Sequence, residues 1–318
     1  MAKNSLVPTV KLNDGTKIPS IAFGTGSKLK FTDVTQYVQN ALEAGFSHID
    51  TAAFYDTEQY VATALRESGL SRNDIYITTK FDGGDIATEA RKSIEKLGVK
   101  YVDLYLIHGP TFAPDVGKAW REFEAIHKEG IVKSIGVSNF RLEHLQQAID
   151  AATVLPTVNQ INFSPYNYAS WKDVLELAAK HNIVIEAYSS LSPITAFPGG
   201  PLDPVLDRIA ARIGGTPAQV IFKWVLSKGA VVVTTSTKRE RLDEYLATPS
   251  LPDLTVEEIA EIEAAGAKGP PSRFNPLVQI RRVMRRGAHA LTAAAIIFLN
   301  VCMAYMIFRW LQAVFHLY

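Results

Sequence analysis

Cysteine is almost absent from this chain, since Cys302 is the single one among 318 residues. One cysteine excludes an internal disulfide, and nothing in the composition points to an oxidising compartment. An excess of either charge is also lacking, because 33 Lys and Arg offset 32 Asp and Glu to a net charge of +1. Without a basic excess or a basic stretch interleaved with aromatic residues, we expect no nucleic-acid partner.

Three common motifs are missing as well. No GxGxxG follows the first predicted strand, which argues against a Rossmann dinucleotide site. There is no HExxH and no cysteine cluster, and the seven histidines are scattered, so we expect no metal site. The first twenty residues, MAKNSLVPTVKLNDGTKIPS, lack an apolar core segment, and we expect no secretory signal.

What the chain has is a repeated alternation of short β-rich runs with helical patterns. The predicted strands are 21–23, 48–50, 75–80, 102–108, 134–138, 158–161, 183–187 and 231–234, and helical patterns follow each of them. This alternation implies parallel strands joined by right-handed crossovers. Eight strands favour an α/β fold of the closed (β/α)8 TIM-barrel type over a doubly wound sheet. A β-hairpin over 10–19 with its turn at 13–15 precedes the barrel.

A long apolar run follows the barrel. Residues 287–308 contain no Asp, Glu, Lys or Arg, and a helix of that length spans roughly 30 Å. Four arginines precede the run within 281–286, which favours a cytosolic position for that flank. We therefore expect a single transmembrane helix, a tail anchor that holds a cytosolic catalytic domain on a membrane. The alternatives are a core or oligomerisation helix, or a cytoplasmic enzyme whose tail is an artefact.

These patterns divide the chain into four parts. We expect the barrel over 1–266, a linker with the basic flank over 267–286, the transmembrane helix over 287–308 and a short tail over 309–318.

Four ionisable side chains lie at or just beyond predicted strand ends: Asp50, Tyr55, Lys80 and His108. Each alone is more often a helix cap, a packing group or a satisfied polar residue. In a (β/α)8 barrel, however, the C-terminal strand ends converge on one mouth, where active sites are built. A phenol, an ammonium, a carboxylate and an imidazole in one pocket could deliver a proton to a substrate.

The segments that carry these residues resemble a known family, the aldo-keto reductases. The resemblance covers about residues 10–265 and rests on GFSHIDTAAFY, YITTKF, YVDLYLIHGP, GVSNF, VNQINFSP and the VTTS segment with a later Arg. The fungal ketoreductases are the most similar branch. The resemblance implies NADPH-dependent reduction of a small aldehyde or ketone to an alcohol by a monomer. The alternative is a membrane-tethered regulatory protein that senses the cofactor and has little turnover.

Within this resemblance, Tyr55 is expected to be the general acid. A free phenol has a pKa near about 10 and donates its proton poorly at neutral pH. Lys80 is expected to lower that pKa by stabilising the phenolate, and Asp50 to hold Lys80 in place. His108 is expected to orient the substrate carbonyl.

The resemblance also implies a set of cofactor-binding residues. Ser138, Asn139 and Gln160 are expected at the nicotinamide carboxamide and Tyr188 against the nicotinamide ring. The full expected set is Gly24, Thr25, Asp50, Ser138, Asn139, Gln160, Tyr188, Ser189, Leu191, Ser192, Ser236 and Arg241.

The adenosine end departs from the family pattern, which puts the cofactor preference in question. Thr235 stands where many members have Lys, and Tyr245 where Asn is frequent. Arg241 keeps a planar cation that suits a 2′-phosphate, so we favour NADPH, with NADH possible. For the substrate, an apolar wall is expected from five phenylalanines: Phe23, Phe54, Phe81, Phe112 and Phe140.

Overall fold

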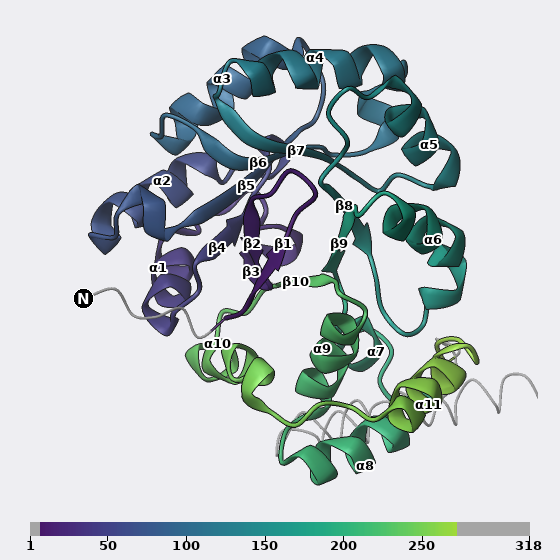
Figure 1. Cartoon of the computed structure of the whole chain (residues 1–318). Helices are drawn as coiled ribbons and strands as arrows, with labels where there is room; N and C mark the ends of the chain where they lie inside the picture. Colours follow the sequence, from purple (N-terminus) through teal and green to yellow (C-terminus); the bar gives the residue numbers. More distant parts are fainter. Residues whose placement is uncertain (1–6, 272–318) are drawn as a thin grey trace, which may run out of the picture.

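The protein is seen here as a computed structural model that describes residues 7–271. Eight parallel strands close into a barrel in the order β10-β3-β4-β5-β6-β7-β8-β9, as Figure 1 shows. They are β3 (Ile21–Gly24), β4 (His48–Asp50), β5 (Tyr76–Phe81), β6 (Val102–Ile107), β7 (Val132–Ser138), β8 (Val158–Asn162), β9 (Val184–Tyr188) and β10 (Val231–Thr234). The predicted (β/α)8 barrel is confirmed.

The predicted hairpin is also present and lies across the N-terminal end of the barrel. Strands β1 (Thr9–Lys11) and β2 (Lys17–Pro19) pair antiparallel, and Gly15 takes a φ of 89° in the turn between them. Asp14 accepts a hydrogen bond from Ser134 of β7 at 2.6 Å. Ile18 packs with side chains from inside the barrel. The hairpin therefore closes the face seen in Figure 1, and the opposite, C-terminal mouth is left for a site.

Helices surround the barrel in a ring. They are α1 (Thr35–Ala44), α2 (Glu58–Ser68), α3 (Ile86–Leu97), α4 (Val116–Lys128), α5 (Leu142–Ala151), α6 (Lys172–Lys180), α7 (Ser192–Thr195), α8 (Asp203–Ile213), α9 (Pro217–Ser227), α10 (Arg239–Leu246) and α11 (Val256–Gly266). Short 3-10 turns lie in several loops, among them η2 (Ala53–Tyr55). The sequence did not predict α7.

Capping side chains set several helix starts. Thr255 followed three residues later by Glu258 predicts a capping box, and it is present at α11, where each side chain accepts a hydrogen bond from the other residue's backbone N–H. The sequence also predicts Thr32 as the N-cap of the first helix, and this is wrong because α1 begins only at Thr35. There the Asp33 carboxylate accepts a hydrogen bond from the Thr35 N–H at 2.8 Å. Asp33, the residue after Thr32, therefore supplies the oxygen that accepts from the first backbone N–H of the helix.

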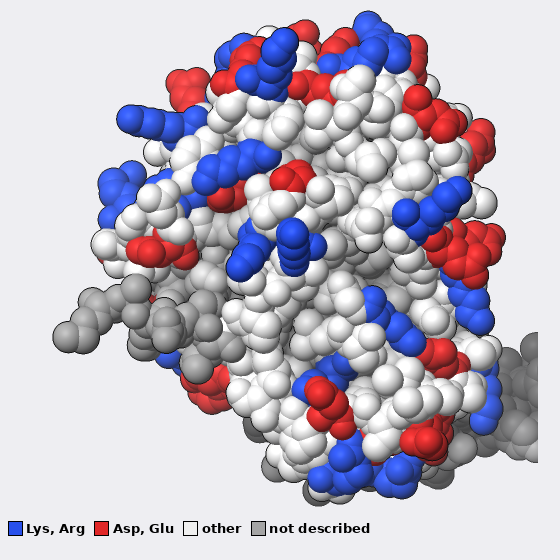
Figure 2. Space-filling model, in the orientation of Figure 1, with Lys and Arg blue, Asp and Glu red and all other residues white. Residues whose placement is uncertain are grey.

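The core lies mainly between the barrel and its helices. Strands β3, β4 and β6 are buried along their whole length, which is expected for strands covered on both faces. Figure 2 shows basic and acidic side chains interspersed on the face that carries the hairpin. The C-terminal ends of these buried strands carry the polar side chains of the candidate site.

Within residues 7–271, no helix is long and apolar enough to cross a membrane. The predicted anchor over 287–308, most of the linker with its basic flank, and the tail over 309–318 lie outside the described residues.

Candidate active site

Asp50 and Lys80 form a buried ion pair at the C-terminal ends of two neighbouring strands. Lys80 Nζ lies 2.7 Å from Asp50 Oδ1 and donates a second hydrogen bond to the Thr51 carbonyl at 2.8 Å. Burial alone would lower the pKa of Lys80, but the charges of Asp50 and Tyr55 and the hydrogen bond to Asp50 outweigh it and raise that pKa. Lys80 is therefore a fixed cation with no exposed surface.

Tyr55 lies against this cation. It ends the 3-10 turn after β4, and its ring centroid is 5.1 Å from Lys80 Nζ. Burial raises the pKa of Tyr55, and the charge of Lys80 lowers it by less, so the net shift is upward. The expected effect of Lys80, which lowers the pKa of Tyr55, is present, but burial has the larger effect and raises that pKa overall. The phenol holds its proton at neutral pH and is ready to donate it.

His108 completes the group of four. It follows β6 directly, and its ring meets the Tyr55 ring edge-on with 5.5 Å between centroids. Burial, followed by the charges of Lys80 and Lys30, lowers the pKa of His108 to about 3. The imidazole is therefore neutral at physiological pH, and one of its ring nitrogens can donate a hydrogen bond without adding a charge.

A second buried carboxyl lies beneath the first. Gln160 donates from its side-chain nitrogen to Asp50 Oδ2 at 2.8 Å and to Glu186 Oε2 at 2.9 Å. Burial, together with the charge of Asp50, raises the pKa of Glu186 to about 8. His48 approaches Glu186 at 3.8 Å, but burial lowers the pKa of His48 to about 3, so the two do not form an ion pair at neutral pH.

One cavity, of about 560 Å³, joins these groups to the expected cofactor residues. Its lining includes Asp50, Tyr55 and His108 together with Gly24, Ser138, Asn139, Gln160, Tyr188, Ser189, Leu191, Ser192, Ser236 and Arg241. Hydrogen bonds hold Asn139 and Tyr188 of this lining in place. Asn139 donates to the His108 carbonyl at 3.0 Å and accepts from the Tyr188 hydroxyl at 2.8 Å. These two hydrogen bonds join the C-terminal ends of β6, β7 and β9 in one wall of the cavity.

Comparison with known proteins agrees with this arrangement. The sequence model of the Aldo/keto reductase family matches residues 20–267, which is more than half of the chain. The chain belongs to this family.

Individual relatives within the aldo/keto reductases cover most of the chain. The NAD/NADP-dependent indole-3-acetaldehyde reductase of Schizosaccharomyces pombe is 34% identical over 80% of this chain and 93% of that protein. The NADPH-dependent alpha-keto amide reductase of Saccharomyces cerevisiae is 36% identical over 83% of this chain and 92% of its own length. Both relatives are fungal, as the motifs indicated.

Solved structures share the fold of this aldo/keto reductase. A crystal structure of an aldo/keto reductase from Brucella melitensis superposes with a TM-score of 0.74 at 36% identity, covering 81% of this chain and 99% of that one. The Bombyx mori aldo-keto reductase in complex with NADP gives the same TM-score at 30% identity, covering 81% and 92%.

Thr25 is the expected cofactor residue that the structure does not bring to the cavity. It is fully buried, and its hydroxyl is taken up by hydrogen bonds to Thr51 and Thr57, each at 2.9 Å. Its backbone N–H binds the Asp50 carbonyl. Thr25 therefore braces the strand end that carries Asp50 and does not line the cavity.

The expected apolar wall is only partly correct. Phe23, Phe81 and Phe140 are buried in the hydrophobic core between the strands and helices and do not line the cavity. Phe54 and Phe112 do lie near the chemistry, since both rings contact the His108 ring. The three core residues lie on or beside strands, and the sequence does not show which way such side chains point.

The sequence analysis missed three residues of this site: Gly26, Lys30 and Glu186. A side chain at position 26 would place its Cβ 3.0 Å from the Tyr55 ring, so the glycine lets the loop pack directly on the phenol. Glu186 had a signal, because it is an acid inside the apolar run IVIEAY. Lys30 had none, since a lysine in a loop is usually a solvated surface group.

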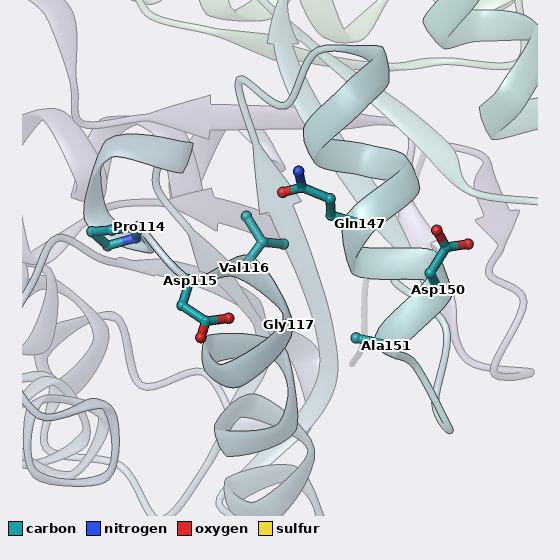
Figure 3. Close-up of a pocket in the computed structure, with 7 residues that line it drawn as sticks. All are labelled: Pro114, Asp115, Val116, Gly117, Gln147, Asp150 and Ala151. Atoms are coloured by element: carbon teal, nitrogen blue, oxygen red, sulfur yellow. The ribbon is translucent and has the colours of Figure 1, made fainter.

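A second hollow, of about 670 Å³, shares no lining residue with the first (Figure 3). Residues at the start of α4 and along α5 line it, including Asp115, Gln147 and Asp150. Asp115 caps α4 by accepting from the Lys118 N–H at 2.8 Å, and Asp150 accepts from Gln146 at 2.7 Å. Both acids thus have ordinary structural partners, and the hollow brings no reactive combination together. The candidate active site is the barrel mouth.

Proposed function

We propose that this aldo/keto reductase reduces an aldehyde or ketone to an alcohol and uses NADPH as the hydride donor. The observation that carries the proposal is that the protonated Tyr55, the neutral His108 and Asp50 line one cavity, with the buried Lys80 paired to Asp50 behind them. Reduction needs a proton at the carbonyl oxygen and a hydride at the carbon. The four side chains supply and control the proton.

In this mechanism Tyr55 gives its proton to the carbonyl oxygen. The phenolate that remains is stabilised by the ammonium of Lys80, which burial and Asp50 hold close to the ring. The neutral His108 donates a hydrogen bond to the same oxygen and fixes its direction. A bound reduced nicotinamide supplies the hydride for the carbonyl carbon.

The residues of the cavity suit a nicotinamide dinucleotide. Ser138, Asn139 and Gln160 offer hydroxyl and amide groups, which match the donors and acceptors of a carboxamide. Tyr188 presents an aromatic ring beside them, held through its hydroxyl. At the other end of the lining, Lys238 and Arg241 provide two cations, which favours the extra phosphate of NADPH over NADH.

The test is cofactor oxidation by the purified full-length chain with a panel of aldehydes and ketones, run with NADPH and with NADH. We expect NADPH consumption that depends on the carbonyl compound and that is lost in Tyr55→Phe. If NADPH binds but no member of a broad panel is turned over, the reductase proposal is wrong. A cofactor-sensing role, in which binding rather than turnover matters, would then replace it.

We also propose that residues 287–308 anchor the enzyme in a membrane with the catalytic domain in the cytosol. The support is the uncharged apolar run and the four arginines before it. The measurement is fractionation of the native protein followed by alkaline carbonate. We expect the full chain to stay with the membranes, and release by carbonate would contradict the anchor and favour a cytoplasmic enzyme.

A further inference from the structure

Lys30 is a cation fixed beside the proton donor. It lies in the loop between β3 and α1, and its Nζ is 5.0 Å from the Tyr55 ring centroid and 5.1 Å from that of Phe54. It lines the same cavity as Tyr55 and His108. The mechanism above gives this ammonium no task, because Lys80 already supplies the charge behind the phenol.

The loop that carries Lys30 is held in one conformation. Ser27 and Phe31 are both in the left-handed region, with φ of 55° and 61°, which is costly for residues other than glycine. The Phe31 N–H donates to the Tyr55 carbonyl at 2.8 Å, and Leu29 is buried beneath the loop. Strain of this kind persists only where neighbouring contacts enforce it, so Lys30 is placed before any substrate arrives.

The charges around the cavity leave Lys30 available for an anion. Asp50 is the one acid among the lining residues, and it is already bound by Lys80 and Gln160. No salt bridge within residues 7–271 includes Lys30. The field of Lys30 reaches the substrate-orienting imidazole, because it contributes to the low pKa of His108. A negative charge close to the reacting carbonyl would therefore meet an unneutralised ammonium.

We propose that Lys30 selects carbonyl substrates that carry a carboxylate, by binding that carboxylate while the carbonyl faces Tyr55 and His108. This inference rests on the proposed reductase function and names a substrate class for it. Phe31 and Phe54 form an edge-to-face pair, 5.8 Å between centroids, and both are exposed, at 64% and 46%. The pair lies beside Lys30, which directly precedes Phe31 and whose Nζ is 5.1 Å from the Phe54 ring centroid, and it forms an apolar border for the carbon skeleton that joins the two groups.

A different task for Lys30 would be to bind a phosphate of the cofactor. Its position argues against this, since Lys30 lies over the Tyr55 and Phe54 rings, where the substrate must reach the proton donor. Lys238 and Arg241 line the cavity at the end that follows β10 and are the cations placed for phosphates. A Lys30 variant would lose the preference for acids if Lys30 binds the substrate, and would lose NADPH affinity if Lys30 binds the cofactor.

The experiment compares acids with their neutral esters. Full-length wild type, Lys30→Met, Lys30→Arg and Lys11→Met are assayed with 4-formylbenzoate and its methyl ester, and with phenylglyoxylate and its methyl ester. Lys11→Met is the charge-matched control, because it removes the same charge at an exposed position of β1 in the hairpin, and Lys11 does not line the cavity. NADPH affinity is measured for each protein by fluorescence quenching.

We expect wild type to have a higher kcat/KM for the acid than for the ester in at least one pair. Lys30→Met should reduce that acid-to-ester ratio roughly tenfold, the value of one partly solvated charge-assisted contact. Lys30→Arg should keep most of the preference, and Lys11→Met should leave the ratio within about twofold. Added salt should shrink the wild-type preference and have little effect on the ratio in Lys30→Met.

Three results would overturn the inference. The first is a wild-type ratio at or below one in both pairs, and the second is an unchanged ratio in Lys30→Met. The third is a loss in Lys30→Met that appears as weaker NADPH binding, which would assign Lys30 to the cofactor. Failure of the reductase proposal looks different, since neither acids nor esters would then be reduced by any of the proteins.

Discussion

Asp50 and Glu186 are two carboxyl groups inside the barrel that share one hydrogen-bond donor, the side-chain nitrogen of Gln160. The nitrogen lies 2.8 Å from Asp50 and 2.9 Å from Glu186. Lys80 pairs with Asp50 at 2.7 Å, and burial together with the Asp50 charge keeps a proton on Glu186. Glu186 is thus neutral at neutral pH, because a buried carboxyl without a matched cation is more stable when it keeps its proton.

Glu186→Gln should change how stability depends on pH. The folded protein holds the Glu186 proton up to about pH 8, whereas the unfolded chain releases it near the ordinary value of 4.5. Folding therefore takes up a proton between these values, and this contribution to stability is complete below pH 4.5 and is lost as the pH rises toward 8. In this pH window the free energy of unfolding of wild type should fall, relative to that of Glu186→Gln, by up to about 1.4 kcal/mol per pH unit.

Urea unfolding of both proteins from pH 5 to 9 measures this difference. His48 and His108 titrate in the opposite direction, but they are present in both proteins and cancel in the comparison. Parallel stability curves for the two proteins would show that Glu186 is ionised in the folded state and that the assignment is wrong.

Tyr55→Phe should remove the proton donor and leave the shape of the site intact. We expect kcat to fall by roughly 10²–10⁴-fold, the range for loss of a positioned acid, while the NADPH dissociation constant changes by less than about twofold. Tyr168→Phe, at a tyrosine that does not line the cavity, is the control and should keep its activity. Near-normal turnover in Tyr55→Phe would remove this residue from the mechanism.

The strand-end groups could be predicted from the sequence because each apolar run stops at a polar residue, and the barrel brings such ends together. The contact between Gln160 and Glu186 could not, since it depends on the register of β8 against β9, which places these residues opposite each other. The direction of the Tyr55 pKa shift was also beyond the sequence. It depends on whether burial or the charge of Lys80 is larger, and that requires coordinates.

The positions of loop residues could not be predicted from the sequence, because they too depend on tertiary contacts. Lys30 and Phe31 have no periodic pattern around them, and their positions follow from a strained loop that hydrogen-bonds to Tyr55. Thr25 was assigned to the cofactor because of where it stands in the motif. Its hydroxyl instead joins a buried cluster with Thr51 and Thr57. Whether a residue at a strand end lines the cavity depends on the direction of its side chain, which the sequence does not show.

Asp50 and Lys80 allow stability to be separated from catalysis. Lys80→Met leaves the Asp50 carboxylate buried without its cation, and breaking such a pair costs about 3–5 kcal/mol. The double variant Asp50→Asn with Lys80→Met removes both charges and should regain part of that stability. It should not regain turnover, because the buried cation that stabilises the Tyr55 phenolate is still absent. Urea unfolding and steady-state assays on the three proteins test this, and restored activity in the double variant would reduce Lys80 to a structural role.

Arg241→Met should weaken NADPH binding much more than NADH binding. Arg241 lines the cavity beside Ser236 and Tyr245, and loss of one charge-assisted phosphate contact should raise the NADPH dissociation constant roughly tenfold. Arg239→Met is the matched control, because Arg239 pairs with Asp243 and Glu43 and does not line the cavity. Fluorescence titration with both cofactors gives the result. Equal weakening of NADPH and NADH would place Arg241 at a part of the cofactor that the two share, and the preference for NADPH would then need another origin, such as Lys238.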